Sequence, residues 1–279
     1  MSRAAIARLA FVAAAAALAA ALAPPPRSQP IRDVAESDAW PPPLRVVAES
    51  DAWLVVDKPA GCPCHARPDR PGVLDLVRAA RPNDATDYKL AHRLDDGTSG
   101  CLVLAKGAAA ARALGDAFAE RRVKKSYVAV TASKPSKKQG VVAGDMVKAR
   151  RGSWRLSRTV GDRAACTWLR KCVGLGGARM LVWRPVTGKT HQIRVAAKAL
   201  GAPLCGDARY GGADADRLYL HAAAIRVDEL GLDASTLPTT GEQFASEAFR
   251  EAWADLDWAD ILDDAAMPKA AREFRSPRQ

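Results

Sequence analysis

The amino-acid sequence predicts a mixed α+β domain built on a mainly antiparallel sheet with flanking helices. From residue 44 onward, short runs rich in β-branched and aromatic residues follow one another, separated by Gly, Pro, Asp and Lys: LRVVAE, AWLVVD, CLVLAK, KSYVAVTA, ACTWLRKCV and ARMLVWRPV. Few helical segments lie between these runs, which favours antiparallel neighbours over the strand–helix–strand units of a parallel sheet. Hydrophobic residues make up 48% of the 279 residues, which is ample for one large core.

Three segments have helical character. An alanine-rich stretch near 108–121 ends in Glu-Arg-Arg, and the segment HQIRVAAKALG follows the turn TGKT and ends at Gly201. The tail 244–265 is predicted to be one acidic amphipathic helix. Its apolar side chains are expected to pack on the body of the protein: Phe244, Phe249, Trp253, Leu256 and Ile261.

The composition divides the chain into three parts. Residues 1–43 are predicted to be a leader and linker, because Arg3 and Arg8 precede an alanine-rich run that ends before three prolines. Alanine is only weakly hydrophobic, so a membrane anchor of about 20 strongly apolar residues is not expected. Residues 44–243 form the folded domain and 244–279 an acidic helical extension. The heptapeptide VAESDAW occurs at 34–40 and again at 47–53, and we assign no function to the repeat.

The charge is concentrated in the middle of the chain. The whole sequence carries +11 with an isoelectric point near 9.6, but residues 44–227 carry +17 and residues 228–279 carry −7. A compact basic body is typical of proteins that bind a polyanion, most often RNA or DNA. Several cysteines lie inside apolar runs, which favours buried thiols in a reducing compartment over a disulfide framework or a metal site.

Asp95 is the first candidate for chemistry. It follows the apolar Ala91 and Leu94 in AHRLDD, so its carboxylate is expected at the end of a largely buried strand. Neighbouring strand residues point to opposite faces, so Asp96 is not expected to flank one bond together with Asp95 as paired glycosidase carboxylates do. From spacing alone, a carboxylate in this position is more often a turn former or an ion-pair partner than a catalyst.

A second candidate group lies in RPVTGKTHQIR. His191 and Arg194 are three residues apart, and Arg194 and Lys198 are four apart, so the three share one helical face. Lys189, His191 and Arg194 near a helix start suit a phosphate or a carboxylate. A solvated basic face explains the same pattern equally well. His221, inside the apolar run LYLHAAAIRV, is more often a hydrogen-bonded core histidine than a ligand.

In this order, these stretches resemble the RluA-type family of RNA pseudouridine synthases over residues 44–227. The segment HRLDDGTSGCLVLAK matches the family pattern HRLD-x-x-TSG-x-x-x-x-AK, and WLVVDKPAG and VKKSYVAV resemble its opening strand and its strand with an aromatic residue. The later blocks are matched by TGKTHQIRV, GDARYGG and LHAAAI. The resemblance implies a pseudouridine synthase fold with a central catalytic cleft and makes residues 44–243 the catalytic domain.

The resemblance also implies roles for individual residues. Asp95 inherits the role of nucleophile or base, Tyr127 would pack against the target base, and Arg194 would pair with Asp95. Thr98 would form a tight turn behind Asp95 with Ser99 and Gly100. The residues expected to contact the substrate are Arg93, Thr98, Lys189, His191, Ile193 and Leu220.

The expected reaction isomerises uridine in rRNA or tRNA without a cofactor or metal, because breaking and remaking one glycosidic bond needs no oxidant or activated donor. The protein is expected to be a monomer without stable membrane association after removal of the leader, in a plastid, a mitochondrion or the cytoplasm. Two other interpretations stay open. One is a non-catalytic RNA-binding or ribosome-assembly factor on the same fold; the other is a secreted basic hydrolase, which would predict disulfides.

Overall fold

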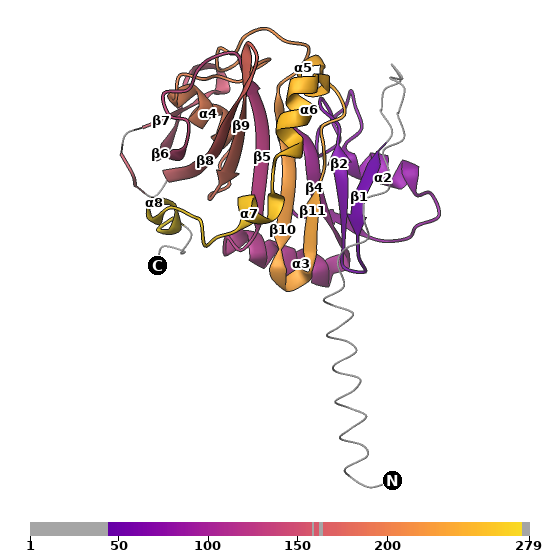
Figure 1. Cartoon of the computed structure of the whole chain (residues 1–279). Helices are drawn as coiled ribbons and strands as arrows, with labels where there is room; N and C mark the ends of the chain where they lie inside the picture. The colour runs from indigo at the N-terminus through magenta and orange to yellow at the C-terminus, as the bar shows by residue number, and fades with distance from the viewer. Residues whose placement is uncertain (1–43, 158, 162–163, 275–279) are drawn as a thin grey trace.

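The computed structural model describes residues 44–157, 159–161 and 164–274 (Figure 1). The predicted leader and the first VAESDAW copy lie outside the described residues. The strands are β1 (Arg45–Glu49), β2 (Trp53–Lys58), β3 (Tyr88–Leu90), β4 (Ser99–Lys106), β5 (Lys124–Thr131), β6 (Gly140–Lys148), β7 (Trp154–Leu156), β8 (Ala164–Leu175), β9 (Ala178–Pro185), β10 (Leu220–Val227) and β11 (Leu232–Ser235). The helices are α2 (Val73–Ala80), α3 (Gly107–Ala119), α4 (Gln192–Ala199), α5 (Glu242–Ala245), α6 (Glu247–Ala254), α7 (Trp258–Leu262) and α8 (Lys269–Arg272), with short 3-10 turns η1 (Arg150–Gly152) and η2 (Asp228–Leu230).

The described strands form one mixed, mainly antiparallel sheet in the order β1-β2-β4-β10-β5-β9-β8-β6-β7, and β3 and β11 pair with β4 and β10. The α+β prediction is confirmed. The pairing of β4 with β10 is the one parallel ladder among the described residues, and there Ser99 lies opposite His221 and Gly100 opposite Ala222. Gly100 has φ +110, and a Cβ at this position would collide with the Ala222 backbone. Only glycine therefore allows the two strands to approach here.

Helices cover both faces of the sheet (Figure 1). Side chains alternate along each strand, so both faces carry apolar residues that pack against these helices. On β4, Val103 packs toward α3 and Leu104 toward α2. On β5, Val128 packs toward the C-terminal helices, whereas Ala129 packs toward α4. The face with α2 and α4 is the one that bears the cleft described below.

The second predicted helix is α4, and Gly201 follows it with φ +71, as expected for a glycine that ends a helix. The first predicted helix, near 108–121, is α3.

No described helix has the length and apolar character needed to cross a membrane.

The tail was predicted as one helix over 244–265, and this is wrong. The side chain of Ser246 accepts a hydrogen bond from the Phe249 amide, and the side chain of Asp257 accepts bonds from Ala259 and Asp260. These two N-caps start new helices, so the segment is divided into α5, α6 and α7. The predicted packing is confirmed, since Phe244, Phe249, Leu256 and Ile261 are buried against the sheet and Trp253 is half-buried beside them.

Candidate active site

A cleft of about 270 Å³ opens on the sheet face that carries α4. Its walls come from the loop before β4, the end of α3, strand β5, the loop between β9 and α4, the start of α4 and the start of β10. The nine residues expected to be catalytic or to contact the substrate all line this cleft, although they come from distant parts of the chain: Arg93, Asp95, Thr98, Tyr127, Lys189, His191, Ile193, Arg194 and Leu220. Lys198, which the sequence grouped with His191 and Arg194, is not among the residues that line it.

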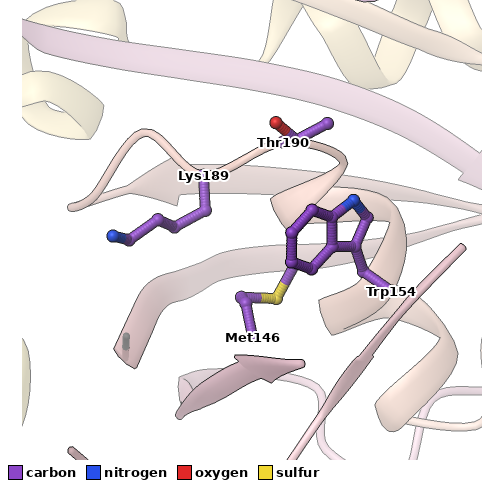
Figure 2. A pocket seen from close by; sticks show the side chains of 4 residues that line it. All are labelled: Met146, Trp154, Lys189 and Thr190. Carbon is purple, nitrogen blue, oxygen red and sulfur yellow. The ribbon is translucent and has the colours of Figure 1, made fainter. Parts of the chain in front are cut away.

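A smaller pocket of about 170 Å³ adjoins the cleft (Figure 2). It shares Lys189 and Thr190 with the cleft and is completed by Met146 of β6 and Trp154 of β7. The two cavities therefore meet at the loop that leads into α4.

Asp95 does not end a strand, which corrects the sequence-based expectation. Strand β3 stops at Leu90, and Asp95 lies in the loop that joins β3 to β4. The Thr98 amide donates a hydrogen bond of 3.0 Å to the Asp95 carbonyl, so the turn spans these two residues. Ser99 and Gly100, predicted to be part of that turn, are already in β4. Because Asp95 lies in a loop, the direction of its side chain is not set by the alternation of side chains along a strand.

The two adjacent carboxylates have different partners, although they lie in a loop and not on the strand from which the sequence argument separated them. The Asp96 carboxylate forms an ion pair of 2.6 Å with Arg67, whereas Asp95 Oδ2 lies 3.3 Å from Arg194 Nη1 and 3.8 Å from His191 Nε2. Asp95 therefore faces two nitrogen-bearing side chains at the start of α4.

Arg194 is held mainly by a residue that the sequence did not single out. Its Nε and Nη2 each donate a hydrogen bond of 2.7 Å to the carboxylate of Asp207, whose side chain is fully buried. Burial alone would lower the Arg194 pKa, but the ion pairs with Asp207 and Asp95 raise it above its ordinary value. Arg194 thus keeps its charge in the wall of the cleft. Gly206 precedes Asp207 with φ +72, and a Cβ there would collide with the Arg217 carbonyl.

His191 connects Asp95 to the neighbouring pocket. It has a left-handed backbone conformation (φ 57) just before α4, and its Nδ1 lies 2.9 Å from the Tyr210 hydroxyl. The Trp154 amide donates a bond of 3.1 Å to the same hydroxyl, which leaves the Tyr210 proton to be donated to His191 Nδ1. Burial lowers the His191 pKa, which favours the neutral ring. Because Nδ1 accepts the Tyr210 proton, the neutral ring carries its own proton on Nε2, the nitrogen that lies 3.8 Å from Asp95 Oδ2.

Strand β5 places Tyr127 and Lys125 on the same face, two residues apart. Both line the cleft. Burial raises the Tyr127 pKa, so its hydroxyl stays protonated at neutral pH. Lys125 lies over the Phe118 ring at 5.3 Å, and burial lowers its pKa to about 8.

Lys58 is a second residue that sequence reasoning missed. It is fully buried at the end of β2, and its Nζ donates to the carbonyls of Pro59, Cys62 and Asp96 at 2.9, 2.6 and 3.0 Å. Burial lowers its pKa to about 8. The bond to Asp96 holds the backbone next to Asp95. An interior lysine directly after an apolar strand, in LVVDKP, was the available signal.

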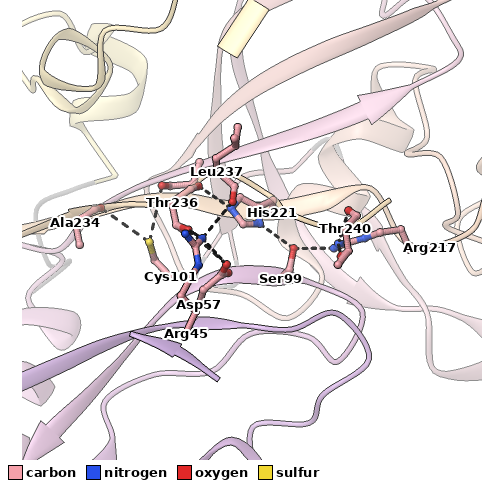
Figure 3. A network of polar contacts seen from close by, with 11 residues as sticks. Arg45, Asp57, Ser99, Cys101, Arg217, His221, Ala234, Thr236, Leu237 and Thr240 are labelled. Carbon is pink, nitrogen blue, oxygen red and sulfur yellow. Dashed lines mark hydrogen bonds and ion pairs between the residues drawn. The ribbon is translucent and has the colours of Figure 1, made fainter. Parts of the chain in front are cut away.

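A buried polar network holds Ser99, the residue that follows the turn from Asp95 to Thr98 (Figure 3). His221 Nε2 donates to the Thr236 carbonyl at 2.8 Å, so its Nδ1 accepts from the Ser99 hydroxyl, also at 2.8 Å. Arg217 donates to Ser99 at 2.7 Å. Burial lowers the His221 pKa to about 4. His221 is therefore a hydrogen-bonded core histidine, as the sequence favoured.

The cysteines form no disulfides, and burial raises the pKa of both Cys62 and Cys64. Over the described ranges, no three or more His, Cys, Asp and Glu residues are grouped so that they could hold a metal ion.

The fold and the cleft together define a class of enzyme. A carboxylate, an arginine and an aromatic ring line one cleft in a basic protein, and this arrangement suits chemistry on a nucleobase that has left its stack.

Comparison with known proteins identifies the family. The model of the RNA pseudouridylate synthase family matches residues 52–199. An uncharacterized RNA pseudouridine synthase of Haemophilus influenzae is 38% identical over 193 residues, which cover 68% of this chain and 85% of that protein. The ribosomal large subunit pseudouridine synthase C of Rickettsia bellii is 36% identical over 183 residues, 62% of this chain and 60% of the relative.

A solved structure agrees. The human RNA pseudouridylate synthase domain containing 1 superposes with a TM-score of 0.58 at 26% identity, over 69% of this chain and 82% of that one. The chain belongs to the RNA pseudouridine synthase family and is an isomerase that acts on uridine in RNA.

Proposed function

We propose that Asp95 is the catalytic carboxylate of this enzyme and that its target uridine enters the cleft beside Tyr127. The observation that carries the proposal is the position of Asp95, whose Oδ2 lies 3.3 Å from Arg194 Nη1 in a cleft also lined by Tyr127. A carboxylate with a fixed cationic neighbour and an adjacent aromatic ring can act on a base held out of its stack.

The reaction balances without another reactant. The C1′–N1 bond of uridine breaks, the base rotates, and a C1′–C5 bond forms; the C5 proton passes to solvent and N1 gains a proton. Asp95 either attacks the sugar or removes a proton to give a glycal-like intermediate. Arg194, anchored by Asp207, stabilises the anionic carboxylate in both routes.

The test is the variant Asp95→Asn, assayed by tritium release from RNA labelled at C5 of uridine. The variant keeps the size of the side chain and removes its charge. We expect turnover to be abolished while RNA affinity stays within about threefold of wild type. Loss of affinity to the same degree as activity would show that Asp95 has a structural role. Asp96→Asn is the matched control, because that carboxylate pairs with Arg67.

We propose large-subunit ribosomal RNA as the substrate, and tRNA as the second candidate. The support is that relatives of this chain are named ribosomal large subunit pseudouridine synthase C. Mapping pseudouridines in rRNA and tRNA, in organelles and cytosol, with and without this gene would identify the RNA and the position. If a non-catalytic assembly factor were the correct interpretation, no uridine would change.

We propose that the protein acts as a monomer, without stable membrane association, in an organelle or the cytoplasm. The support for an organelle is the composition of residues 1–43. A fusion of this segment to a fluorescent reporter tests the destination, and sedimentation of the purified protein tests the oligomeric state. Secretion of the reporter would count heavily against an RNA enzyme.

A further inference from the structure

The pocket formed by Met146, Trp154, Lys189 and Thr190 has no part in the proposed chemistry at Asp95 (Figure 2). Met146 is 3% exposed and packs against the half-buried Trp154, whereas Lys189 and Thr190 are exposed. A pocket of about 170 Å³ is smaller than the roughly 300–1,000 Å³ of sites that enclose a drug-sized ligand. It is therefore suited to one ring whose attached groups stay outside.

Two lysines lie near the pocket that Trp154 lines. Lys148 lies directly opposite Trp154 in the β6–β7 ladder, so the two side chains emerge on the same face, and Lys148 is exposed. Lys189 supplies a second cation on the side of the pocket that joins the cleft. An aromatic ring with lysines nearby is a combination that can stack a base and bind the phosphate backbone.

The pocket is held at a set position relative to Asp95. The Trp154 amide and His191 Nδ1 both bond to the Tyr210 hydroxyl, at 3.1 and 2.9 Å. His191 Nε2 in turn lies 3.8 Å from Asp95 Oδ2. Because one tyrosine hydroxyl joins the backbone of β7 to the cleft, a group in the pocket has a defined distance from a base at Asp95.

We propose that this pocket binds the nucleobase of a nucleotide next to the target uridine, stacked on Trp154, with the intervening phosphate bound by Lys189. This inference rests on the proposed function of the cleft and adds the residues that select the flanking nucleotide. The two cavities share Lys189 and Thr190 in their walls, so they are adjacent and one RNA strand can span both.

The first test compares Trp154→Ala with Trp154→Phe. We expect Trp154→Ala to raise the KM for RNA roughly 5- to 150-fold, which corresponds to the ~1–3 kcal/mol of one base–aromatic stack. Trp154→Phe retains a ring and should restore most of the affinity. The rate constant at saturating RNA should fall much less than in Asp95→Asn. Trp258→Ala is the matched control, because this half-buried tryptophan lies on α7, outside both cavities.

The second test reads stacking without turnover. The probe is a uridine-rich single-stranded RNA with one 2-aminopurine, bound at low salt to proteins that carry Asp95→Asn. We expect 2-aminopurine fluorescence to be quenched on binding, and the quenching to be lost in Trp154→Ala but kept in Trp154→Phe and Trp258→Ala. Equal quenching in Trp154→Ala would overturn the inference.

Lys189→Ala tests the phosphate contact. Each phosphate neutralised on a single strand contributes about 0.7 to the slope of log affinity against log salt, so the slope should fall by about that amount. An unchanged slope would remove Lys189 from the inference. If wild-type protein released no tritium, the proposed function would fail, yet the fluorescence test would still decide whether the pocket stacks a base.

Discussion

Arg194 and Asp207 form a two-pronged ion pair in which Nε and Nη2 each lie 2.7 Å from a carboxylate oxygen, whereas Nη1 alone faces Asp95 at 3.3 Å. The guanidinium is a planar fork, so two bonds to Asp207 define the direction of the third nitrogen. Asp207 therefore orients the Arg194 guanidinium toward Asp95. Arg194 does not need bound substrate to adopt this position.

The first prediction concerns Asp207→Asn. The variant keeps the shape of the side chain but leaves the buried Arg194 without its main counter-charge. Removing one partner of a buried ion pair typically costs about 3–5 kcal/mol of unfolding free energy. We expect a loss near the lower value, because the Asn side chain still accepts one hydrogen bond from Arg194. Thermal unfolding should show the loss of stability, and tritium release at a temperature where the variant is folded should show a lower kcat. A folded variant with wild-type kcat would contradict the orienting role.

The second prediction concerns Lys58→Met, which has a similar size and no donor. Three backbone carbonyls would lose their bond to Nζ, and each unsatisfied buried group costs about 1–3 kcal/mol. We expect a clear drop in unfolding temperature, and lower turnover because the Asp96 backbone beside Asp95 is released. Lys89→Met, at an exposed lysine, should change neither quantity. Unaltered activity in stable Lys58→Met protein would separate Lys58 from the site.

The third prediction is a loss of stability in acid that depends on His221. Its pKa is about 4 in the folded protein against an ordinary 6.5, so between these values the unfolded chain binds more protons than the folded one. Stability is therefore lost as pH falls from 6.5 to 4, by at most ~3 kcal/mol from this residue. Denaturant unfolding across this range measures the loss. His221→Gln, which does not titrate, should lose less, and an identical profile would show that other groups dominate.

The fourth prediction concerns Lys125, which lines the cleft with a pKa of about 8 in the free protein. As pH rises through 8, this lysine loses its charge, so RNA affinity should fall more steeply in wild-type protein than in Lys125→Met. Binding titrations between pH 7 and pH 9 compare the two. If RNA affinity fell equally with pH in both proteins, Lys125 would not bind a phosphate of the RNA.

The fifth prediction tests the tail. Phe249 of α6 is fully buried against β5 and β9, so Phe249→Ala should cost about 3–5 kcal/mol of unfolding free energy. The ratio of kcat to KM measured on folded protein should stay near that of wild type, because the tail packs on the face opposite α4. Trp258→Ala, at a half-buried neighbour, should cost less. A large loss of activity in folded Phe249→Ala would connect the tail to the cleft.

The α+β class, the six strands β1, β2, β4, β5, β8 and β9, and the limits of α4 followed from the sequence, because they depend on local properties: apolar runs of strand length, turn residues between them, and a glycine after the helix. Strands β3, β6, β7 and β11 were not predicted. The nine predicted residues that line the cleft were identified mainly through the resemblance of the sequence to a family. Where local signals competed, the prediction failed. Ser246 and Asp257 are strong N-caps inside a continuous apolar pattern, and they divided the expected single helix into three.

The tertiary structure alone revealed the residues that hold the site in position. Asp207 is more than a hundred residues from Asp95 along the chain, and after a glycine it has the pattern of an ordinary turn residue. Lys58 resembles a surface lysine that ends a strand until three carbonyls are seen to converge on it. Charge pairs and carbonyl cages depend on distance in space, and a linear sequence records only distance along the chain.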